Sequence, residues 1–284
     1  MLRTPAASIV IPTRERPEYL DVTLASVLDQ ARRAGAEVLV VSDGGDRATA
    51  AVAARHGVPV LALTPRAGLN AARNAGAAAT SSSVIVFVDD DVEAPPDWLA
   101  SLLSGMRRAP DREVFGGPIR ARLEGSPPRA CGREPAPITT LDFGREDRDV
   151  ALVWGANMAV RRSALQRVGP FDESLAGAGD EEEWQHRYVA RGGRVRYVAQ
   201  AGLDHRRTAS DSTIRSLSRA AYGRGASARR YDVRKGTAPS PRAELRILAG
   251  CAWHIIRRRC ANGVVLGAHS AGRLSELLAQ RHCR

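Results

Sequence analysis

The sequence "VIVFVDDDVEAP", residues 84–95, joins an apolar run to three successive aspartates. Residues 84–88 are apolar throughout, which predicts a strand buried on both faces, as in a parallel sheet. Asp89, Asp90 and Asp91 follow without a break. Neighbouring carboxylates repel each other and raise each other's pKa, so we expect a positive group beside them. On these residues alone, a solvated turn remains the alternative.

Strand and helix patterns alternate on the N-terminal side of this stretch. Apolar runs at 8–11, 37–43 and 58–63 predict three more buried strands. Between them, Pro17 and Gly35 bound a helical pattern, residues 49–56 predict a second helix, and residues 67–81 predict a loop that leads into a third. The alternation predicts an α/β fold with a mostly parallel sheet and helices on both faces.

Asp43 and the aspartate run both follow predicted strands. Ligands of open parallel sheets bind beyond the carboxyl ends of the strands, so we expect both acidic sites at one edge. Hard divalent ions prefer oxygen ligands, commonly one or two carboxylates together with substrate phosphates. A divalent metal is therefore our candidate for the positive group at this edge.

The following segments continue the pattern more irregularly. Residues 114–123 predict one strand, and residues 124–137, with four prolines and two glycines, predict a loop. Helices are expected from about Ser163, and from about Asp180 to the glycines at 192–193, followed by a strand at 194–201. The acidic run that opens the second of these helices has a structural alternative, because acidic residues complement the helix dipole.

Charge is divided unevenly along the 284 residues. Residues 206–284 hold 17 Arg and Lys against 4 Asp and Glu, whereas the rest of the chain is close to neutral. The net charge of the whole chain is +11. A basic tail of this kind suits an anionic membrane surface, nucleic acid or an acidic partner. Its residues 242–259 place apolar side chains on one side of a helix, which favours a membrane interface, packing on the protein or a dimer contact.

Other features of the composition restrict the location of the protein. Cys131, Cys251, Cys260 and Cys283 show no close pairing, so we expect neither a disulfide framework nor a cysteine metal site. We see no signal peptide, and residues 247–256 are too short an apolar run to cross a bilayer. We therefore expect a cytoplasmic protein, with peripheral contact at the inner membrane face as an option.

Five segments in order resemble glycosyltransferase family 2, the inverting sugar transferases with a GT-A fold. They are "SIVIPTRERPEYL" (8–20), "VLVVSDGG" (38–45), "GLNAARNAGAAATSSSVIVFVDDD" (68–91), "WGANMAVRRSALQRVGPFDE" (154–173) and "GDEEEWQHR" (179–187). The resemblance covers about residues 6–207. It implies a GT-A (Rossmann-like) domain, with the basic helical extension lying outside the likeness.

The resemblance assigns expected roles to individual residues. It implies nucleotide-sugar binding by Pro12, Thr13, Arg16, Asp43, Arg73, Asp89 and Asp90. Asp89 and Asp91 match the family's DXD pair, and the expected metal ligands are Asp91, Asp89 and His205. The implied cofactor is Mn²⁺ or Mg²⁺. Trp154 and Asn157 match the floor between donor and acceptor, although core packing is the alternative for Trp154.

The catalytic carboxylate of the family falls in the segment at 179–187. The family pair is Glu followed by Asp, and Asp180 and Glu181 stand here in the reverse order. Either carboxylate is chemically able to take the proton of an acceptor hydroxyl, so both are candidates for the general base.

We therefore expect a metal-dependent inverting glycosyltransferase that moves a sugar from a nucleotide-sugar to an acceptor hydroxyl. The acceptor is a glycan, a lipid carrier or a small natural product, and we expect no nucleic-acid partner. The alternatives are a catalytically weakened nucleotide-sugar-binding protein and a nucleotidyltransferase. The expected segments are residues 1–115 for the nucleotide-sugar, 116–207 for the acceptor and catalysis, and 208–284 for the basic extension.

Overall fold

The computed structural model describes residues 5–126, 131, 136–175, 177 and 179–282. Its contacts divide the chain into two units. The first comprises Met1–Arg120, Leu141–Ser174 and Asp180–His205, and the second comprises Ala121–Thr140, Leu175–Gly179 and Arg206–Arg284. The two expected halves of the catalytic domain thus fold mainly into one unit. The chain passes between the units several times.

The first unit is built on a sheet whose described strands run in the order β3-β2-β1-β4-β9-β6-β10-β8. Pairing is parallel among β1, β2, β3 and β4 and between β6 and β10, whereas β9 runs antiparallel to both β4 and β6. The strands are β1 Ser8–Thr13, β2 Glu37–Asp43, β3 Val60–Leu63, β4 Val84–Val88, β6 Val114–Gly116, β8 Arg148–Val150, β9 Asn157–Arg161 and β10 Val195–Tyr197. The prediction of a mostly parallel sheet is confirmed.

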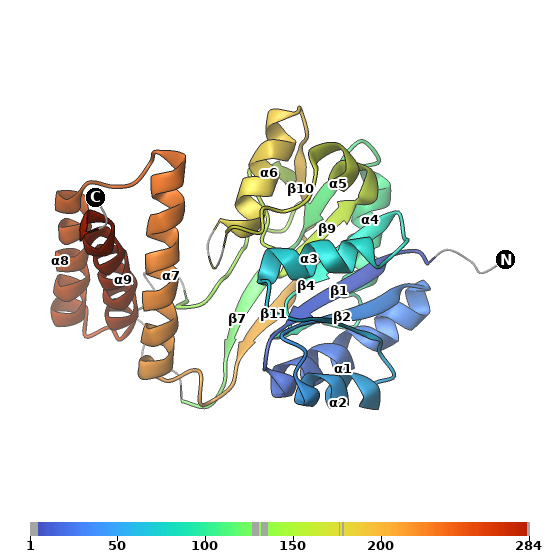
Figure 1. Ribbon diagram of the computed structural model, residues 1–284, viewed down its shortest axis with the longest axis horizontal. Coiled ribbons are helices and arrows are strands. Elements are labelled where there is room, and N and C mark those ends of the chain that lie inside the picture. The colour runs from blue at the N-terminus through green and yellow to red at the C-terminus, as the bar shows by residue number, and fades with distance from the viewer. Residues whose placement is uncertain (1–4, 127–130, 132–135, 176, 178, 283–284) are drawn as a thin grey trace. The chain divides into compact units, whose positions relative to one another are not determined.

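Helices lie on both sides of this sheet (Figure 1). α1 packs against α2 and α4, and α3 packs on β1 and β2 on the opposite side, in contact with α6. Gly76 allows the close approach of α3, because a Cβ there would lie 2.3 Å from Val10 Cγ1. The helices are α1 Pro17–Ala34, α2 Arg47–Arg55, α3 Leu69–Ala78, α4 Trp98–Arg108, α5 Arg162–Val168 and α6 Asp180–Ala190.

The predicted strand at 114–123 is broken in the structure. Its first part is β6, and its second part is β7, Ile119–Leu123, which belongs to a separate three-stranded sheet with β5, Val92–Glu93, and β11, Leu203–Arg207. The break falls at Gly117, where a Cβ would lie 2.0 Å from the Ala201 carbonyl oxygen. This small sheet brings the chain after β10 back to the end of β4.

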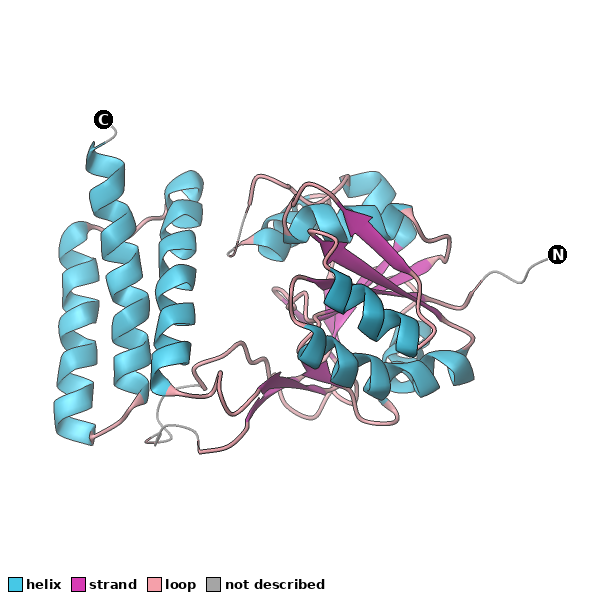
Figure 2. Cartoon of the chain, turned by 60° about the horizontal axis from the view of Figure 1, so that its bottom comes forward, coloured by secondary structure: helices cyan, strands magenta, loops and turns pink. Residues whose placement is uncertain are grey.

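The second unit consists mainly of long helices, which Figure 2 shows in cyan. They are α7 Ile214–Lys235, α8 Pro241–Arg258 and α9 Asn262–His282. α7 and α9 make the closest contact, because Gly225 lies against the backbone of His269 and Gly272 against that of Tyr222. None of the helices in the described part of the chain is both long and apolar enough to cross a membrane.

A buried charged network links the three helices. Glu244 on α8 is fully buried and accepts a hydrogen bond from Arg273 Nε at 2.8 Å. Arg229 Nη1 lies 3.4 Å from the same carboxylate oxygen, and Arg273 Nη2 reaches Asp232 at 2.9 Å. A buried charge that loses its partner is strongly destabilising, so removal of any one of these side chains should weaken the contact between the helices.

The predicted loop at 124–137 lies mostly outside the described residues. At its ends, Glu124 pairs with Arg206, and Ile138 joins a small apolar cluster with Leu217, Ala221 and Val265. These contacts explain why residues 121–140 belong to the second unit.

Candidate active site

The aspartates that follow β4 lie in different environments. Asp90 is buried, accepts a hydrogen bond from Thr13 Oγ1 at 2.7 Å and lies 2.9 Å from Arg16 Nη1. Burial raises the pKa of Asp90 to about 7; the charge of Asp91 adds to this effect, and Arg16 opposes it. Asp91 is also buried and lies 2.5 Å from Arg16 Nη2. Arg16 thus supplies positive charge to the aspartate run.

His205 approaches Asp91 from the small sheet. β11 pairs with β5 so that His205 stands opposite Val92, directly after the aspartates. Its Nε2 atom lies 3.2 Å from Asp91 Oδ2, and the side chain is almost fully buried. The structure therefore brings together two of the predicted metal ligands.

Asp89 is the most open of the three aspartates, with 32% of its side chain exposed. Asp89, Asp91 and His205 offer carboxylate oxygens and an imidazole nitrogen, and the side chains of Asp91 and His205 are in direct contact. This donor set fits Mn²⁺ well and Mg²⁺ through its oxygen atoms. Because Arg16 already pairs with Asp91, a bound cation would share that carboxylate with the guanidinium or displace it.

A buried arginine joins the aspartate run to the second acidic cluster. Arg73 on α3 is 2% exposed, and its Nη1 lies 3.3 Å from Asp180 Oδ2 and 3.4 Å from Glu181 Oε2. Its Nη2 lies 3.8 Å from Asp89 Oδ1. Arg73 therefore stands between the two groups of carboxylates that the sequence places about 90 residues apart.

The backbone of Gly155 completes the surroundings of Glu181. Its N–H donates a hydrogen bond to Glu181 Oε1 at 2.9 Å. A Cβ at Gly155 would lie 2.1 Å from Arg73 Nη2, so any larger residue would push the guanidinium away. Gly155 is a site residue missed in the sequence, where its place within "WGANMAVRR" is the available signal.

Asp180 and Glu181 hold one proton between them at pH values below about 7 and above the lowered pKa of Glu181. Burial and the adjacent charge of Glu181 raise the pKa of Asp180 to about 7, against the opposing effect of Arg73. Burial acts in the same direction on Glu181, but Arg73, a hydrogen bond from Asp180 and the Gly155 N–H together lower its pKa. Protonated Asp180 thus donates to ionised Glu181, which is the carboxylate able to accept a proton.

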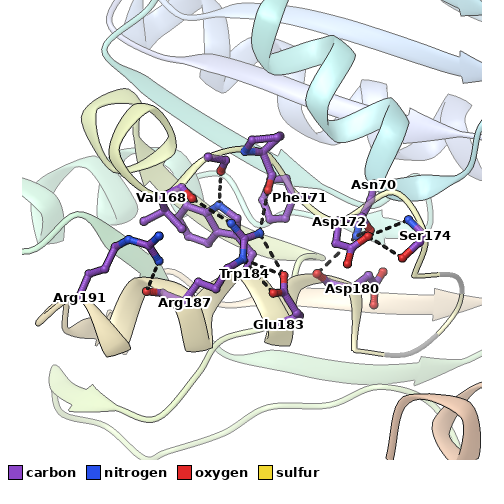
Figure 3. A network of polar contacts seen from close by, with 12 residues as sticks. Asn70, Val168, Phe171, Asp172, Ser174, Asp180, Glu183, Trp184, Arg187 and Arg191 are labelled. Atoms are coloured by element: carbon purple, nitrogen blue, oxygen red, sulfur yellow. Dashed lines mark hydrogen bonds and ion pairs between the residues drawn. The ribbon is translucent and has the colours of Figure 1, made fainter. Parts of the chain in front are cut away.

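The first turn of α6 is held in place by contacts that Figure 3 shows. Asn70 Nδ2 donates to the Asp172 carbonyl at 2.8 Å and lies 3.4 Å from the Asp180 carbonyl. Farther along the helix, Trp184 Nε1 donates to the Gly169 carbonyl at 2.7 Å. Arg187 bridges Glu183 and the carbonyls of Val168 and Pro170. Asn70 is a further positioning residue that sequence analysis did not identify.

Asp43 lies at the end of β2, as predicted, but its carboxylate also organises the chain after β3. Asp43 Oδ1 accepts hydrogen bonds from the backbone N–H groups of Ala67 at 2.7 Å and Gly68 at 3.2 Å. Pro12 is buried within β1, one residue before Thr13. These residues line the carboxyl ends of the central strands, the edge at which ligands of such sheets bind.

The two residues proposed for the acceptor side differ in placement. Trp154 is partly buried and packs against the hydrophobic core of the first unit. Asn157 is fully buried, accepts a hydrogen bond from Trp98 Nε1 at 2.9 Å and donates to the carbonyls of Pro118 and Ala201. These contacts engage both ends of the amide and brace the core, and contact of Asn157 with a sugar stays a prediction.

Comparison with known proteins identifies the family of the chain. The model of the family described as "Glycosyl transferase family 2" matches residues 8–169, which is more than half of the chain. The chain belongs to glycosyltransferase family 2. This family 2 chain is therefore a glycosyltransferase, and its family supports transfer from a nucleotide-sugar.

Two curated relatives illustrate the range of the family. A "Glucosyl-dolichyl phosphate glucuronosyltransferase" of Haloferax volcanii is 27% identical over 215 residues, which cover 70% of this chain and 68% of that protein. A "Pre-mycofactocin glycosyltransferase" of Mycobacterium tuberculosis is 31% identical over 227 residues, or 76% of this chain and 46% of that protein. The chain thus spans less than half of the second relative.

Solved structures support the fold. A mannosyltransferase from Pyrobaculum calidifontis, described in complex with GDP-Man and Mn²⁺, superposes with a TM-score of 0.61 at 17% identity. The match covers 99% of this chain and 81% of that one. TarS of S. aureus superposes with a TM-score of 0.54 at 18% identity over 76% of this chain and 39% of its own. The predicted GT-A fold is confirmed.

Proposed function

We propose that this glycosyltransferase is metal-dependent and inverts the anomeric centre as it moves a sugar to an acceptor hydroxyl. The observation that carries the proposal is the placement of Arg73 in contact distance of Asp89, Asp180 and Glu181. An arrangement of this kind sets a candidate metal and diphosphate site beside a candidate general base.

On the donor side, Asp89, Asp91 and His205 would hold a divalent cation. When bound, the cation would offset the negative charge that develops on the departing diphosphate. The mannosyltransferase described with GDP-Man and Mn²⁺ supports this assignment by analogy. Pro12, Thr13, Arg16 and Asp43 would line the nucleotide, and Asp90 would hold Thr13 and Arg16 in position through its two contacts.

On the acceptor side, Glu181 would act as the base. It would take the proton of the acceptor hydroxyl while that oxygen forms a bond to the anomeric carbon and the bond to the diphosphate oxygen breaks. Attack from the face opposite the leaving group inverts the centre. Asp180, as the protonated partner, would keep Glu181 ionised and oriented, while Trp154 would supply an apolar surface for a sugar ring.

The acceptor class remains broad in the proposal: a glycan, a lipid carrier or a small natural product. The named relatives include enzymes acting on a dolichyl phosphate sugar and on pre-mycofactocin, and a "Validoxylamine A glucosyltransferase" of Streptomyces hygroscopicus is 29% identical over 220 residues. The main alternative is a nucleotide-sugar-binding protein with weakened catalysis, which the reversed Asp180–Glu181 order favours.

The experiment that tests the proposal combines donor binding with turnover. A panel of nucleotide-sugars is screened by thermal shift with and without Mn²⁺, because a ligand that binds only the folded chain raises Tm by mass action. The selected donor is then assayed for hydrolysis and for transfer to candidate acceptors. We expect one donor to stand out only when Mn²⁺ is present, and Asp91→Ala to abolish both effects while the fold is retained. Full turnover in excess EDTA would remove the metal from the proposal.

A second surface is proposed to contact an anionic membrane. On α8, Leu245, Trp253 and Ile256 are 56%, 65% and 74% exposed. Helical spacing places these apolar residues along one stripe, with Arg242, Arg246 and Arg257 exposed near it. Apolar residues combined with arginine on one helix suit binding at the interface of an anionic bilayer.

A further inference from the structure

The second unit gathers two cysteines and a histidine that the proposed transfer reaction does not use. Cys131 comes from the segment at 121–140, His254 from the last turns of α8, and Cys260 from the turn between α8 and α9. The two Sγ atoms and one imidazole nitrogen all lie within 4.8 Å of one another. Because Cys131 lies far from His254 and Cys260 in the sequence, no spacing pattern predicts this cluster.

The distances within the cluster are close to those between the ligands of a bound metal ion. Cys131 Sγ lies 3.4 Å from His254 Nε2, and the backbone N–H of Cys131 donates to Cys260 Sγ at 3.2 Å. Around a tetrahedral zinc ion, with Zn–S of about 2.3 Å and Zn–N of about 2.0 Å, sulfur and nitrogen ligands are about 3.5 Å apart. The three groups therefore need only small movements to meet one ion.

The chain adopts an uncommon conformation to place Cys260 there. α8 ends at Arg258, and the next residue, Arg259, is a non-glycine residue in the left-handed conformation with φ 48° and ψ 39°. A side chain in this region is disfavoured relative to glycine by about 1 kcal/mol or more. The turn at Arg259 carries the backbone past the end of α8, so that the side chain of Cys260 is buried near His254.

The chemistry of the ligands selects the class of ion. Thiolate sulfur and imidazole nitrogen suit Zn²⁺, whereas Mg²⁺ and Ca²⁺ prefer oxygen. We propose that Cys131, His254 and Cys260 bind one zinc ion, which ties the segment at 121–140 to the α8–α9 turn. Three protein ligands leave a fourth coordination position for water or another small ligand. This site is independent of the proposed sugar transfer.

Metal content tests the proposal directly. Full-length protein purified under reducing conditions is analysed for zinc, together with Cys260→Ser and His254→Ala. A matched control, Cys251→Ala, removes another buried cysteine of α8 that lies outside the cluster. We expect about one zinc per chain in the wild type and in the control. We expect a loss of most of it in the two cluster variants.

Cobalt provides a second readout that needs no variant to fold. Metal-depleted wild-type protein is titrated with Co²⁺, and we expect a thiolate-to-cobalt charge-transfer band that saturates at one equivalent. Asp91→Ala should keep this band, because the carboxylate site contributes no sulfur. Absence of the band in the wild type, zinc retained by both cluster variants, or a Cys131–Cys260 disulfide found by thiol counting and mass mapping would each overturn the zinc site.

Discussion

Arg73 is a buried cation that faces more negative charge than it can neutralise. Three carboxyl groups, those of Asp89, Asp180 and Glu181, lie within 4 Å of its guanidinium. The excess is reduced by a proton on Asp180, whose pKa is raised to about 7 by burial and by the charge of Glu181. Burial and Glu181 therefore favour the protonated form of Asp180, against the opposing charge of Arg73.

This arrangement predicts different effects for two isosteric changes. Glu181→Gln removes the proposed proton acceptor, so turnover at saturating donor should fall by about 10²–10⁴-fold while donor affinity barely changes. Asp180→Asn keeps a side chain able to donate to Glu181, so its turnover should fall much less. Turnover and donor affinity are measured separately for both variants. If Asp180→Asn proves to be the more damaging change, the base is Asp180; near wild-type turnover in both excludes this pair as the base.

The raised pKa of Asp180 also predicts a dependence of stability on pH. An unfolded aspartate has a pKa of about 3.9, so between about pH 4 and pH 7 the folded state holds a proton that the unfolded state has released. Stability from this group is complete below pH 4 and is lost as the pH rises to about 7. The side chain of the Asp180→Asn variant does not titrate. The Tm of this variant relative to that of the wild type should therefore rise between about pH 4 and pH 7 and stay constant above pH 7. Asp29→Asn, at an exposed site, controls for the substitution itself, and a pH-independent difference would contradict the raised pKa.

The aspartate run, Arg73 and the acidic start of α6 could be predicted from the sequence as parts of one site, because each matches a family segment. Their mutual contacts could not. The sequence gives no signal that Arg16 pairs with Asp90 and Asp91, or that Gly155 donates to Glu181, since both depend on how distant loops meet. For Asn157 the motif could not tell a sugar contact from a structural role. The structure shows that its amide braces the core.

At the scale of elements, several helix boundaries could be predicted from single residues in the sequence. Pro17 begins α1, Gly35 ends it in the left-handed conformation, and α6 begins at Asp180 as predicted. The break between β6 and β7 and the antiparallel insertion of β9 were not foreseen. Both depend on non-local contacts, such as the approach of Gly117 to Ala201, that leave no periodic trace in the sequence.

The contact of α7 with α9 yields a prediction with a built-in control. A Cβ at Gly225 would lie 2.0 Å from the His269 carbonyl oxygen, whereas a Cβ at Gly223 in the same helix meets nothing within 4 Å. Gly225→Ala should therefore destabilise the protein by about 1–3 kcal/mol through overpacking. Gly223→Ala should stabilise it by up to about 1 kcal/mol through helix propensity. Denaturant unfolding followed by far-ultraviolet circular dichroism measures both, and equal effects would mean that the helices are not in close backbone contact.

At the scale of the whole molecule, positive charge is concentrated in the part that carries the exposed apolar stripe of α8. Residues 206–284 carry a net charge of +13, and the whole chain carries +11 because the remaining residues are slightly acidic. Attraction between exposed charges weakens with salt, whereas the burial of apolar side chains does not. The two contributions to membrane binding are therefore separable by experiment.

Sedimentation with vesicles separates them. We expect the wild type to bind vesicles containing anionic lipid, to bind neutral vesicles weakly and to be partly released by high salt. A variant with Trp253→Ser and Ile256→Ser should bind anionic vesicles several-fold more weakly, whereas Val189→Ser, at an exposed apolar site of the first unit, should not. Concentration-dependent self-association that the double substitution abolishes, without vesicle binding, would instead assign the stripe to a dimer contact.

The interleaved path of the chain between its two units bears on how such proteins are recombined in evolution and in the laboratory. Because residues 121–140 fold with the C-terminal helices, a single crossover in the gene near codon 207 cannot exchange one helical unit for another. It would leave Ile138 and Cys131 facing foreign partners in place of Leu217, Val265 and Cys260. The C-terminal helices and the internal segment at 121–140 must therefore be exchanged together. Chimaeric proteins should fold only when both segments come from the same parent.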